Sequence, residues 1–383
     1  MELNLCFKQK GEGRDTMTDW KKLLDQGIED ITELAGVLGI DRKDLSELCR
    51  IQEMFPMYVN PYYLSLIDFE DSEDPIRKMC IPDKVELKNG GDFDTSGEHD
   101  NTVMNGMQHK YAPTVLILST NKCAMYCRHC FRKRLVGLSE EEIAQHIDDM
   151  VRYVKEHTKI SNVLISGGDA FLNSSETIQK YLEEFTAIPH IDLIRFGTRT
   201  PVVLPQRITT DPGLVAMLEE YGRKKQIYVV TQFNHPREIT AEAAEAVRLL
   251  MRAGIVVRNQ TVLLRGVNDT PEVLGALLRG LTSIGVIPYY IFQCRPVTGV
   301  HSQFQVPLHE AYRIVEGAKQ LQSGQGKGLR YVLSHVTGKI EILGEMEGGQ
   351  MLFKYHQAKD LKNAGRIFTQ EVSPGQCWLD IEE

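Results

Sequence analysis

Three cysteines share one short segment, and cysteine thiolates are the soft ligands that select iron–sulfur clusters. Cys123, Cys127 and Cys130 are spaced C-x3-C-x2-C, so one loop offers three thiolates, one fewer than the irons of a cubane cluster. The fourth iron would then be open to a small molecule. A structural zinc site usually needs a second C-x2-C pair, which is absent from the sequence, and His129 would crowd the geometry as a fourth ligand. Three buried reduced thiols are the remaining alternative.

An alternation of strands and helices from residue 114 onward must position this loop. Apolar runs typical of buried parallel strands are Thr114–Ser119, Asn162–Ser166, Asp192–Gly197, Gln226–Gln232, Ile255–Leu264 and Ile287–Gln293. Amphipathic helices are predicted between them at Ser139–His157, Glu176–Thr186, Ala241–Ala253 and Pro271–Ile284, with Ser139, Ser175, Thr240 and Thr270 as caps. These units predict an α/β fold whose parallel sheet curls into an incomplete (β/α)6 barrel.

Functional groups of such folds lie at the carboxyl ends of the strands. The cysteine loop directly follows the first predicted strand, and Gly167-Gly168-Asp169 follows the second. Because glycine has no Cβ, these two residues would let backbone carbonyls approach the amine of a ligand closely. An ordinary turn is the alternative for this tripeptide.

The composition is that of a globular protein, with 383 residues of which 42% are hydrophobic and 25% charged. A formal net charge of −8 argues against a nucleic-acid-binding surface. The longest apolar stretches are too short to span a bilayer, and the first residues do not resemble a secretory signal, so no membrane partner is expected. The five cysteines outside the loop are scattered and include Cys6, which is unlike a disulfide framework. We therefore expect a reducing compartment, with the cytoplasm as the default.

The flanks differ from the alternating region. Residues 1–60 have charged, helical patterns, residues 86–106 are polar and rich in Gly, Asp and Asn, and the tail has short β-like pieces at Arg330–Leu333, Ile340–Leu343 and Gln350–Tyr355. We expect a helical N-terminal extension and linker at 1–108, the (β/α)6 core at 109–328 and a C-terminal segment at 329–383.

The spacing of the three cysteines resembles that of the radical S-adenosylmethionine (SAM) enzymes. The resemblance implies a [4Fe–4S] cluster on Cys123, Cys127 and Cys130. It also implies that SAM binds the open iron through its amino and carboxylate groups and is cleaved to a 5′-deoxyadenosyl radical. In that superfamily a motif such as Gly167-Gly168-Asp169 grips the methionine amine of SAM, and a reducing protein such as flavodoxin or ferredoxin donates the electron.

Residues 55–355 resemble the lysine 2,3-aminomutase family more specifically. The matching runs are Phe55–Asp68, Phe196–Ile208, Phe233–Thr240, Asn259–Asn268 and Pro288–Cys294. The resemblance implies that an amino group moves between adjacent carbons, with SAM as the radical source and pyridoxal phosphate (PLP) as the carrier of the amine. It also implies a homo-oligomer.

The same resemblance gives roles to single residues. Lys339 matches the lysine that holds PLP as a Schiff base, and Arg132 matches the arginine that binds the substrate carboxylate. The family usually offers two arginines to the PLP phosphate. Here Lys110 keeps one of those charges and Thr114 replaces the other. Gln260 is expected to hydrogen-bond the cofactors, unless it is an amide that only lines the barrel.

Two positions depart from the lysine-specific members, which use two aspartates to neutralise the distal ammonium of lysine. Arg295 and Ser334 stand at those positions. A cation there repels an ammonium and suits an acidic side chain, so glutamate is the leading substrate. The alternative is that Arg295 points away or pairs with a local carboxylate. The tail offers only Cys377, so the zinc site of the lysine enzymes is not implied.

Three other functions remain open at this point. The first is a true L-lysine 2,3-aminomutase, with the missing anions supplied from elsewhere. The second is modification of a lysine on a translation factor, because His109-Lys110-Tyr111 resembles shorter relatives with that role. The third is a non-catalytic iron–sulfur binding protein, which would have no need for Lys339.

Overall fold

The computed structural model describes residues 19–380, and its strands form one twelve-stranded sheet in chain order. Seven neighbouring strands are parallel: β3 (Thr114–Thr120), β4 (Asn162–Gly167), β5 (Leu193–Gly197), β6 (Gln226–Thr231), β7 (Val256–Leu263), β8 (Ile287–Gln293) and β9 (Arg330–His335). Antiparallel strands extend both edges: β1 (Thr102–Met104) and β2 (Met107–Tyr111) on one side, β10 (Gly338–Glu345), β11 (Gln350–Ala358) and β12 (Ile367–Glu371) on the other. Within the described residues β1 and β12 do not pair, so the sheet is open. The predicted α/β fold with an incomplete barrel is confirmed.

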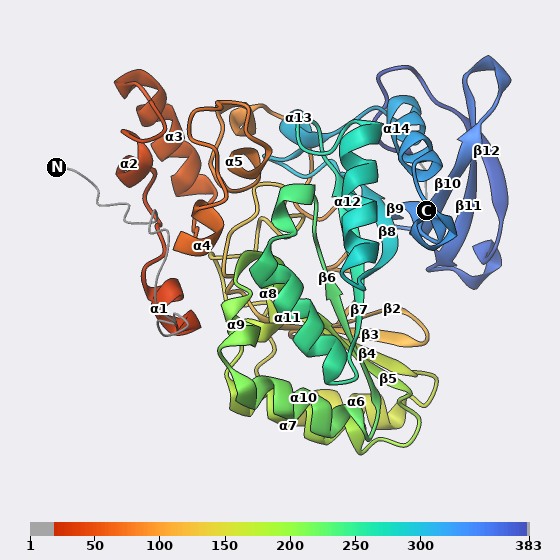
Figure 1. Ribbon diagram of the computed structural model, residues 1–383. Coiled ribbons are helices and arrows are strands. Elements are labelled where there is room, and N and C mark those ends of the chain that lie inside the picture. Colours follow the sequence, from red (N-terminus) through yellow and green to blue (C-terminus); the bar gives the residue numbers. More distant parts are fainter. Residues whose placement is uncertain (1–18, 381–383) are drawn as a thin grey trace.

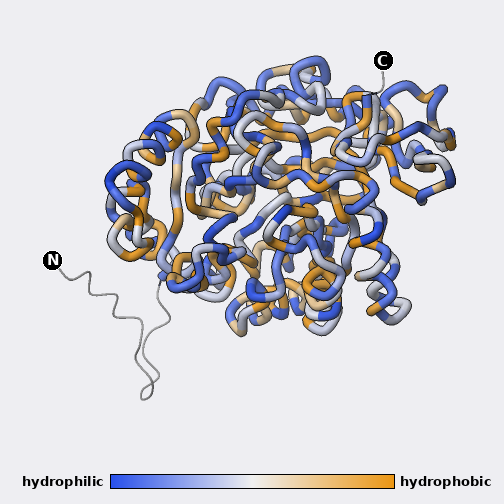
Figure 2. Tube along the Cα trace, turned by 90° about the horizontal axis from the view of Figure 1, so that it is seen from above, coloured by the Kyte–Doolittle hydropathy of each residue, from blue (hydrophilic) through white to orange (hydrophobic). Residues whose placement is uncertain are grey.

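Long amphipathic helices connect the parallel strands and cover the outer face of the curved sheet (Figure 1). They are α6 (Ile147–Glu156), α7 (Ser175–Thr186), α10 (Pro212–Gly222), α11 (Ala241–Arg252), α12 (Pro271–Ser283) and α14 (Leu308–Gln320). Each buries one apolar stripe; α12, for example, buries Leu274, Leu277 and Leu281. Seen from above, apolar and polar segments of the trace alternate along the peripheral helices, as this packing requires (Figure 2). Across residues 19–380 no helix combines the length and apolar character needed to cross a bilayer.

The cap predictions hold for two helices and fail for two. Thr240 and Thr270 accept hydrogen bonds from the backbone N–H groups three residues later. Helix α7 is capped by Ser174, not Ser175. The helix predicted at Ser139–His157 is wrong in its first half, because α6 begins only at Ile147.

The physical reason for this late start is a tertiary contact. The N–H of Ala144 donates to the carbonyl of Leu118 in β3. The Ala144 backbone also lies so close to Gly106 that a Cβ there would clash with it. The segment before α6 therefore packs against β3 and the turn between β1 and β2, and it is not helical.

Four short helices and the thirteen-residue α3 form the N-terminal part of the described chain, on the side of the molecule opposite β10–β12 (Figure 1). They are α1 (Trp20–Asp25), α2 (Ile31–Leu34), α3 (Arg42–Met54), α4 (Pro61–Leu64) and α5 (Pro75–Cys80); further short helices are α8 (Thr200–Val203), α9 (Gln206–Thr209) and α13 (His301–Phe304). Residues 1–18, with Cys6, lie outside the described residues. The polar stretch 86–106 is irregular apart from β1 and the end of the 3₁₀ helix η1 (Lys84–Leu87), but it carries Glu86 and Glu98 into the interior.

Gly167, the last residue of β4, and Gly168 directly after it pack against the start of the cysteine loop. A Cβ on Gly167, whose φ is +111°, would lie 2.4 Å from the carbonyl oxygen of Thr120, and one on Gly168 would lie 2.4 Å from that of Lys122. The N–H of Gly168 donates to the Thr120 oxygen. The backbone that approaches these glycines most closely is thus that of the loop. This is a different reason from the close ligand approach expected from the sequence.

Replacing Gly168 by alanine is therefore expected to lower the free energy of unfolding by about 1–3 kcal/mol, because the added methyl group overpacks the contact with Lys122. Denaturant unfolding measures the change. Gly324→Ala is the control, because a Cβ at Gly324 meets nothing within 4 Å and should leave the stability unchanged. Equal stability of both variants would contradict the contact.

Candidate active site

Two cavities lie side by side inside the curved sheet and share part of their walls. The first, of about 270 Å³, is lined by the three cysteines of the loop and by Gly167, Gly168 and Asp169. The second, of about 510 Å³, is lined by Lys110, Ser334 and Lys339. Arg132, Gln260 and Arg295 line both. The structure therefore brings every residue singled out in the sequence to one of these cavities or to their common wall.

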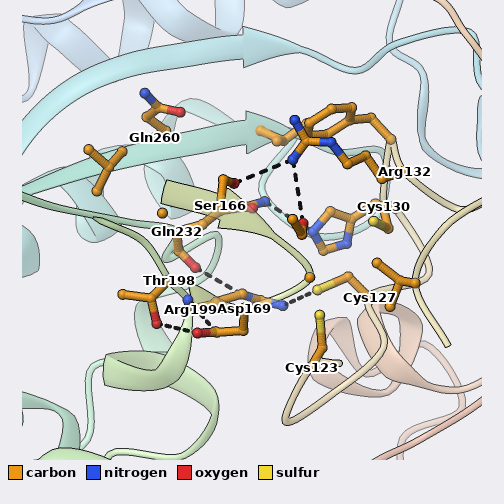
Figure 3. Close-up of a pocket in the computed structure, with 18 of the residues that line it drawn as sticks. Cys123, Cys127, Cys130, Arg132, Ser166, Asp169, Thr198, Arg199, Gln232 and Gln260 are labelled. Atoms are coloured by element: carbon orange, nitrogen blue, oxygen red, sulfur yellow. Dashed lines mark hydrogen bonds between the residues drawn. The ribbon is translucent and has the colours of Figure 1, made fainter. Parts of the chain in front are cut away.

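The cysteine loop reaches the first cavity from the end of β3 (Figure 3). Cys123, Cys127 and Cys130 are each half-buried at the wall. Burial raises the pKa of Cys130 to about 11 and that of Cys123 well above its usual range. These thiols do not ionise readily by themselves, whereas a bound metal deprotonates a coordinating thiol. Their chemistry and convergence on one cavity fit a positively charged iron–sulfur centre.

The geometry suits a cluster better than one ion. In residues 19–380 no three His, Cys, Asp or Glu side chains are gathered closely enough to bind a single metal ion. A cubane cluster binds each cysteine to a different iron, so its three thiolates do not need to meet at one point.

Arg199, at the end of β5, connects the cysteine loop to its surroundings. Its Nη1 donates to Cys127 Sγ at 2.9 Å (Figure 3). Its Nη2 donates to Glu238 at 2.5 Å. Its backbone N–H donates to the Asp169 carboxylate at 2.7 Å. Sequence reasoning gave Arg199 no role. It could have been found by the strand-end rule, since Thr198 and Arg199 directly follow a predicted strand.

The Asp169 carboxylate already accepts hydrogen bonds from other groups of the protein. It accepts hydrogen bonds from Thr198 Oγ1 at 2.5 Å and from the backbone N–H groups of Phe171 and Arg199. Burial nevertheless raises its pKa. Asp169 therefore fixes the end of β5 against the end of β4, and the Gly167 carbonyl, 3.4 Å from Arg132 Nη1, lies at the cavity wall.

His129 also lies in the wall of the first cavity. Its Nε2 is 3.1 Å from the amide nitrogens of both Gln232 and Asn234, so that atom is the acceptor of the ring. Its Nδ1 is buried and has no hydrogen-bond partner within the described part of the chain. Burial holds the pKa of His129 well below its ordinary value. The wall of the first cavity thus includes a neutral imidazole whose Nδ1 has no hydrogen-bond partner in the described residues, and such a group suits a polar ligand.

Arg132 already has a counter-ion, Glu98. Arg132 Nη2 lies 2.9 Å from the Glu98 carboxylate, and Arg134 Nη2 lies 2.8 Å from it. Although burial acts in the opposite direction, these two guanidinium groups hold the pKa of Glu98 at about 2. Sequence reasoning missed Glu98, because it lies in an irregular polar stretch without any periodic signal.

Lys339 extends from β10 into the second cavity. Its residue pairs directly with Ser334 of β9, and its Nζ lies 4.3 Å from the centre of the Tyr290 ring. Burial, together with the nearby cations Arg195, Arg295 and Lys110, lowers the pKa of Lys339 to about 7. This lowered pKa favours a neutral, nucleophilic amine more than an exposed lysine would have.

Lys110 lies in the same cavity with a different arrangement. Its Nζ donates to the carbonyl oxygens of His335 at 2.7 Å and Ser96 at 3.1 Å. Burial, with Arg295 and Lys359 nearby, lowers its pKa to about 7. Because its pKa is lowered and its amine already donates to two backbone carbonyls, Lys110 offers less positive charge to a ligand than an exposed lysine would.

Arg295 lies on the wall common to both cavities. Its guanidinium carbon is 4.2 Å from the centre of the Phe131 ring, and its buried Nη1 has no hydrogen-bond partner among residues 19–380. Burial lowers its pKa to about 10, so it stays a cation at neutral pH. A buried cation without a paired carboxylate favours an anionic ligand group.

Comparison with known proteins agrees with this geometry. A family model described as the radical SAM superfamily matches residues 117–276. A putative L-lysine 2,3-aminomutase of Aquifex aeolicus is 39% identical over 91% of this chain and 94% of its own. The L-lysine 2,3-aminomutase of Clostridium subterminale is 40% identical over 80% of this chain and 73% of its own. The glutamate 2,3-aminomutase of Clostridioides difficile is 37% identical, over 81% and 73% respectively.

The open sheet, the cysteine loop and these matches define a radical SAM enzyme. Within that class, the chain belongs to the aminomutase family that includes lysine and glutamate 2,3-aminomutases. Membership implies an isomerase that uses a [4Fe–4S] cluster and SAM. Cys123, Cys127 and Cys130 are the residues that would hold the cluster, which supplies the electron for radical formation from SAM when bound.

Replacing any one of the three loop cysteines by alanine is expected to abolish most of the bound iron, because two thiolates on one loop hold a cubane poorly. Iron content and visible absorbance after anaerobic reconstitution measure the loss. Cys49→Ala is the control, since this half-buried cysteine lies in α3. Full iron content in a loop variant would show that the cluster is bound elsewhere.

Proposed function

We propose that this chain is a PLP-dependent amino-acid 2,3-aminomutase, an intramolecular aminotransferase that moves an α-amino group to the β-carbon. The observation that carries the proposal is the Lys339 amine. It has a pKa of about 7 and lies in a cavity that shares a wall with the cysteine cavity. A partly neutral lysine beside a cluster site is what an enzyme needs to combine PLP with radical chemistry.

In this proposal, the residues of each cavity have a separate role. PLP, when bound, carries the migrating amino group, and SAM provides the radical that removes an inert hydrogen. The Lys339 amine is the nucleophile that attaches PLP. Apolar wall residues such as Phe131 and Phe292 line both cavities and keep water away from the reacting atoms. The electron comes from outside the chain, and we propose that a reducing protein such as flavodoxin or ferredoxin donates it.

The substrate that the geometry favours is glutamate or another amino acid without a distal ammonium. Arg295 faces both cavities with an unpartnered Nη1, and Ser334 lies opposite Lys339 in the β9–β10 pair. A distal carboxylate would pair with Arg295, whereas the ammonium of lysine would be repelled by it. The match to a glutamate 2,3-aminomutase supports this choice.

L-Lysine 2,3-aminomutase is the second candidate, because seven of the matched relatives carry that name, two of them as putative. Its ammonium would need an anion in the second cavity. Glu98 is the one acidic residue in the described lining, and it is already paired with Arg132 and Arg134. We therefore rank lysine below glutamate.

Replacing Lys339 by alanine is expected to abolish the covalent attachment of PLP, because the nucleophilic amine is lost. Borohydride reduction of the PLP-loaded protein, followed by peptide mass spectrometry, should place the label on Lys339. Lys362→Ala is the control, because Lys362 is exposed on a turn and should leave the labelling unchanged. Label on another lysine, or undiminished label in the Lys339→Ala variant, would exclude the assignment.

Replacing Arg295 by methionine is expected to lower kcat/KM for glutamate about 10- to 100-fold, the range for loss of one charged hydrogen bond. Turnover of alanine, which has no distal group, should change little. An anaerobic assay of β-amino products measures both, with Arg252→Met on the exposed end of α11 as the control. Robust turnover of lysine by the unaltered protein would rule out this substrate assignment.

A further inference from the structure

Two arginines inside the second cavity have no ligand group assigned to them in the proposed reaction. Arg195 extends from β5 and Arg258 from β7, and both line the cavity that contains Lys339. The Nε atom of each is buried and has no hydrogen-bond partner in the described residues. Neither guanidinium group has a carboxylate within ion-pair distance between residues 19 and 380. Buried, unmatched donors of this kind are costly unless a ligand satisfies them.

The whole cavity has an excess of positive charge. Its lining contains six basic residues and one acidic residue, Glu98. The basic residues are Lys110, Arg132, Arg195, Arg258, Arg295 and Lys339. Since Glu98 is paired with Arg132 and Arg134, it does not neutralise Arg195 or Arg258. The cavity is therefore built for a ligand with more than one negative charge.

The two arginines are held in place by neighbours that are not anions. Arg195 Nη2 donates to Asn162 Oδ1 at 2.6 Å. The guanidinium carbon of Arg258 lies 5.2 Å from the ring centre of Tyr228 and 4.8 Å from that of Tyr289. Aromatic contacts of this kind orient a guanidinium without using its N–H donors. Both groups are thus positioned in advance, with donors left over.

Arg195 and Arg258 lie in the same cavity as the position at which the sequence lacks an expected arginine. Thr114 stands where the resembled family usually has its second phosphate-binding arginine, and Thr114 lines the same cavity. Its Oγ1 lies 3.3 Å from Asn162 Oδ1, the same oxygen that accepts from Arg195. One hydrogen-bond network thus links the lost cation position to Arg195, and Arg258 lines the cavity from β7.

We infer that Arg195 and Arg258 form a binding site for the phosphate monoester of the ligand that Lys339 holds, in place of the arginine absent at position 114. The inference rests on the proposed use of PLP. A phosphate monoester carries close to two negative charges and three acceptor oxygens at neutral pH, which matches two guanidinium groups with unused donors. The amino-acid carboxylates are left to the Arg132 and Arg295 end of the cavity.

The test compares PLP with pyridoxal, which has the same aldehyde but no phosphate, in titrations of the full-length protein followed by visible absorbance. Arg195→Gln and Arg258→Gln are each expected to weaken PLP binding about 10- to 100-fold, the range for one charged hydrogen-bonding group. Binding of pyridoxal should be unchanged in Arg258→Gln. In Arg195→Gln it should fall less than that of PLP, because Arg195 is one of the cations that lower the pKa of Lys339. Arg252→Gln, at an exposed position in α11, is the control for loss of an arginine as such.

A rescue variant protects the test against simple misfolding. Adding Thr114→Arg to the Arg258→Gln variant returns a cation to the same cavity and should recover most of the PLP affinity. Circular dichroism melting checks that each variant is folded. Equal loss of PLP and pyridoxal affinity, or no loss of either, would overturn the phosphate site. A raised KM for the amino acid with unchanged PLP affinity would also overturn it.

Failure of the proposed function gives a different result. If the unaltered protein attaches neither PLP nor pyridoxal, the PLP-dependent reaction is wrong. Binding of inorganic phosphate, measured by calorimetry, then tests the anion site independently of PLP. Phosphate binding that is lost in Arg258→Gln would keep the anion site, and absence of phosphate binding would remove it.

Discussion

The buried ion pair between Arg199 and Glu238 is the contact on which the cysteine cavity depends. Glu238 is fully buried and also accepts hydrogen bonds from Tyr63 and from the backbone N–H groups of Asn234 and His235. Arg199 in turn contacts Cys127 and the carbonyl of Gln232. One pair of charges therefore joins the N-terminal helices, the ends of β5 and β6 and the cysteine loop. Such a pair costs desolvation energy but fixes a single geometry when its other donors and acceptors are also satisfied.

Charge is distributed very differently in the two cavities. Around the cysteines the polar groups are mostly matched to one another, as for Arg199 with Glu238 and Asp169 with Thr198. In the second cavity the cations outnumber the acids. Burial, reinforced by these neighbouring cations, lowers the pKa of Lys339 and of Lys110 to about 7. The excess positive charge thus adds to the effect of burial on the lysine amine and also favours anionic ligands.

The six predicted strands agree with β3–β8 to within one residue at each end, because buried parallel strands appear as continuous apolar runs. The cysteine loop and Gly167–Asp169 could be placed because they directly follow such strands. Glu98 could not, since nothing in an irregular segment tells which carboxylate turns inward. Arg195 and Arg258 were also missed, because a charge inside an apolar run shows its direction only once the strand register is known.

Lys339 occupies the middle of a three-strand ladder. Its backbone pairs with Ser334 on one side and Gln357 on the other, and Gly338 before it lies so close to Gln357 that a Cβ would not fit. The main chain at this point is thus clamped, and the mobility of the amine comes from its four methylene groups. In the proposed reaction, the Lys339 amine would stay close to PLP after its release and could react with it again quickly, as an intramolecular reactant does. The β-ladder fixes the backbone of Lys339, so the length of the side chain limits how far its amine can move.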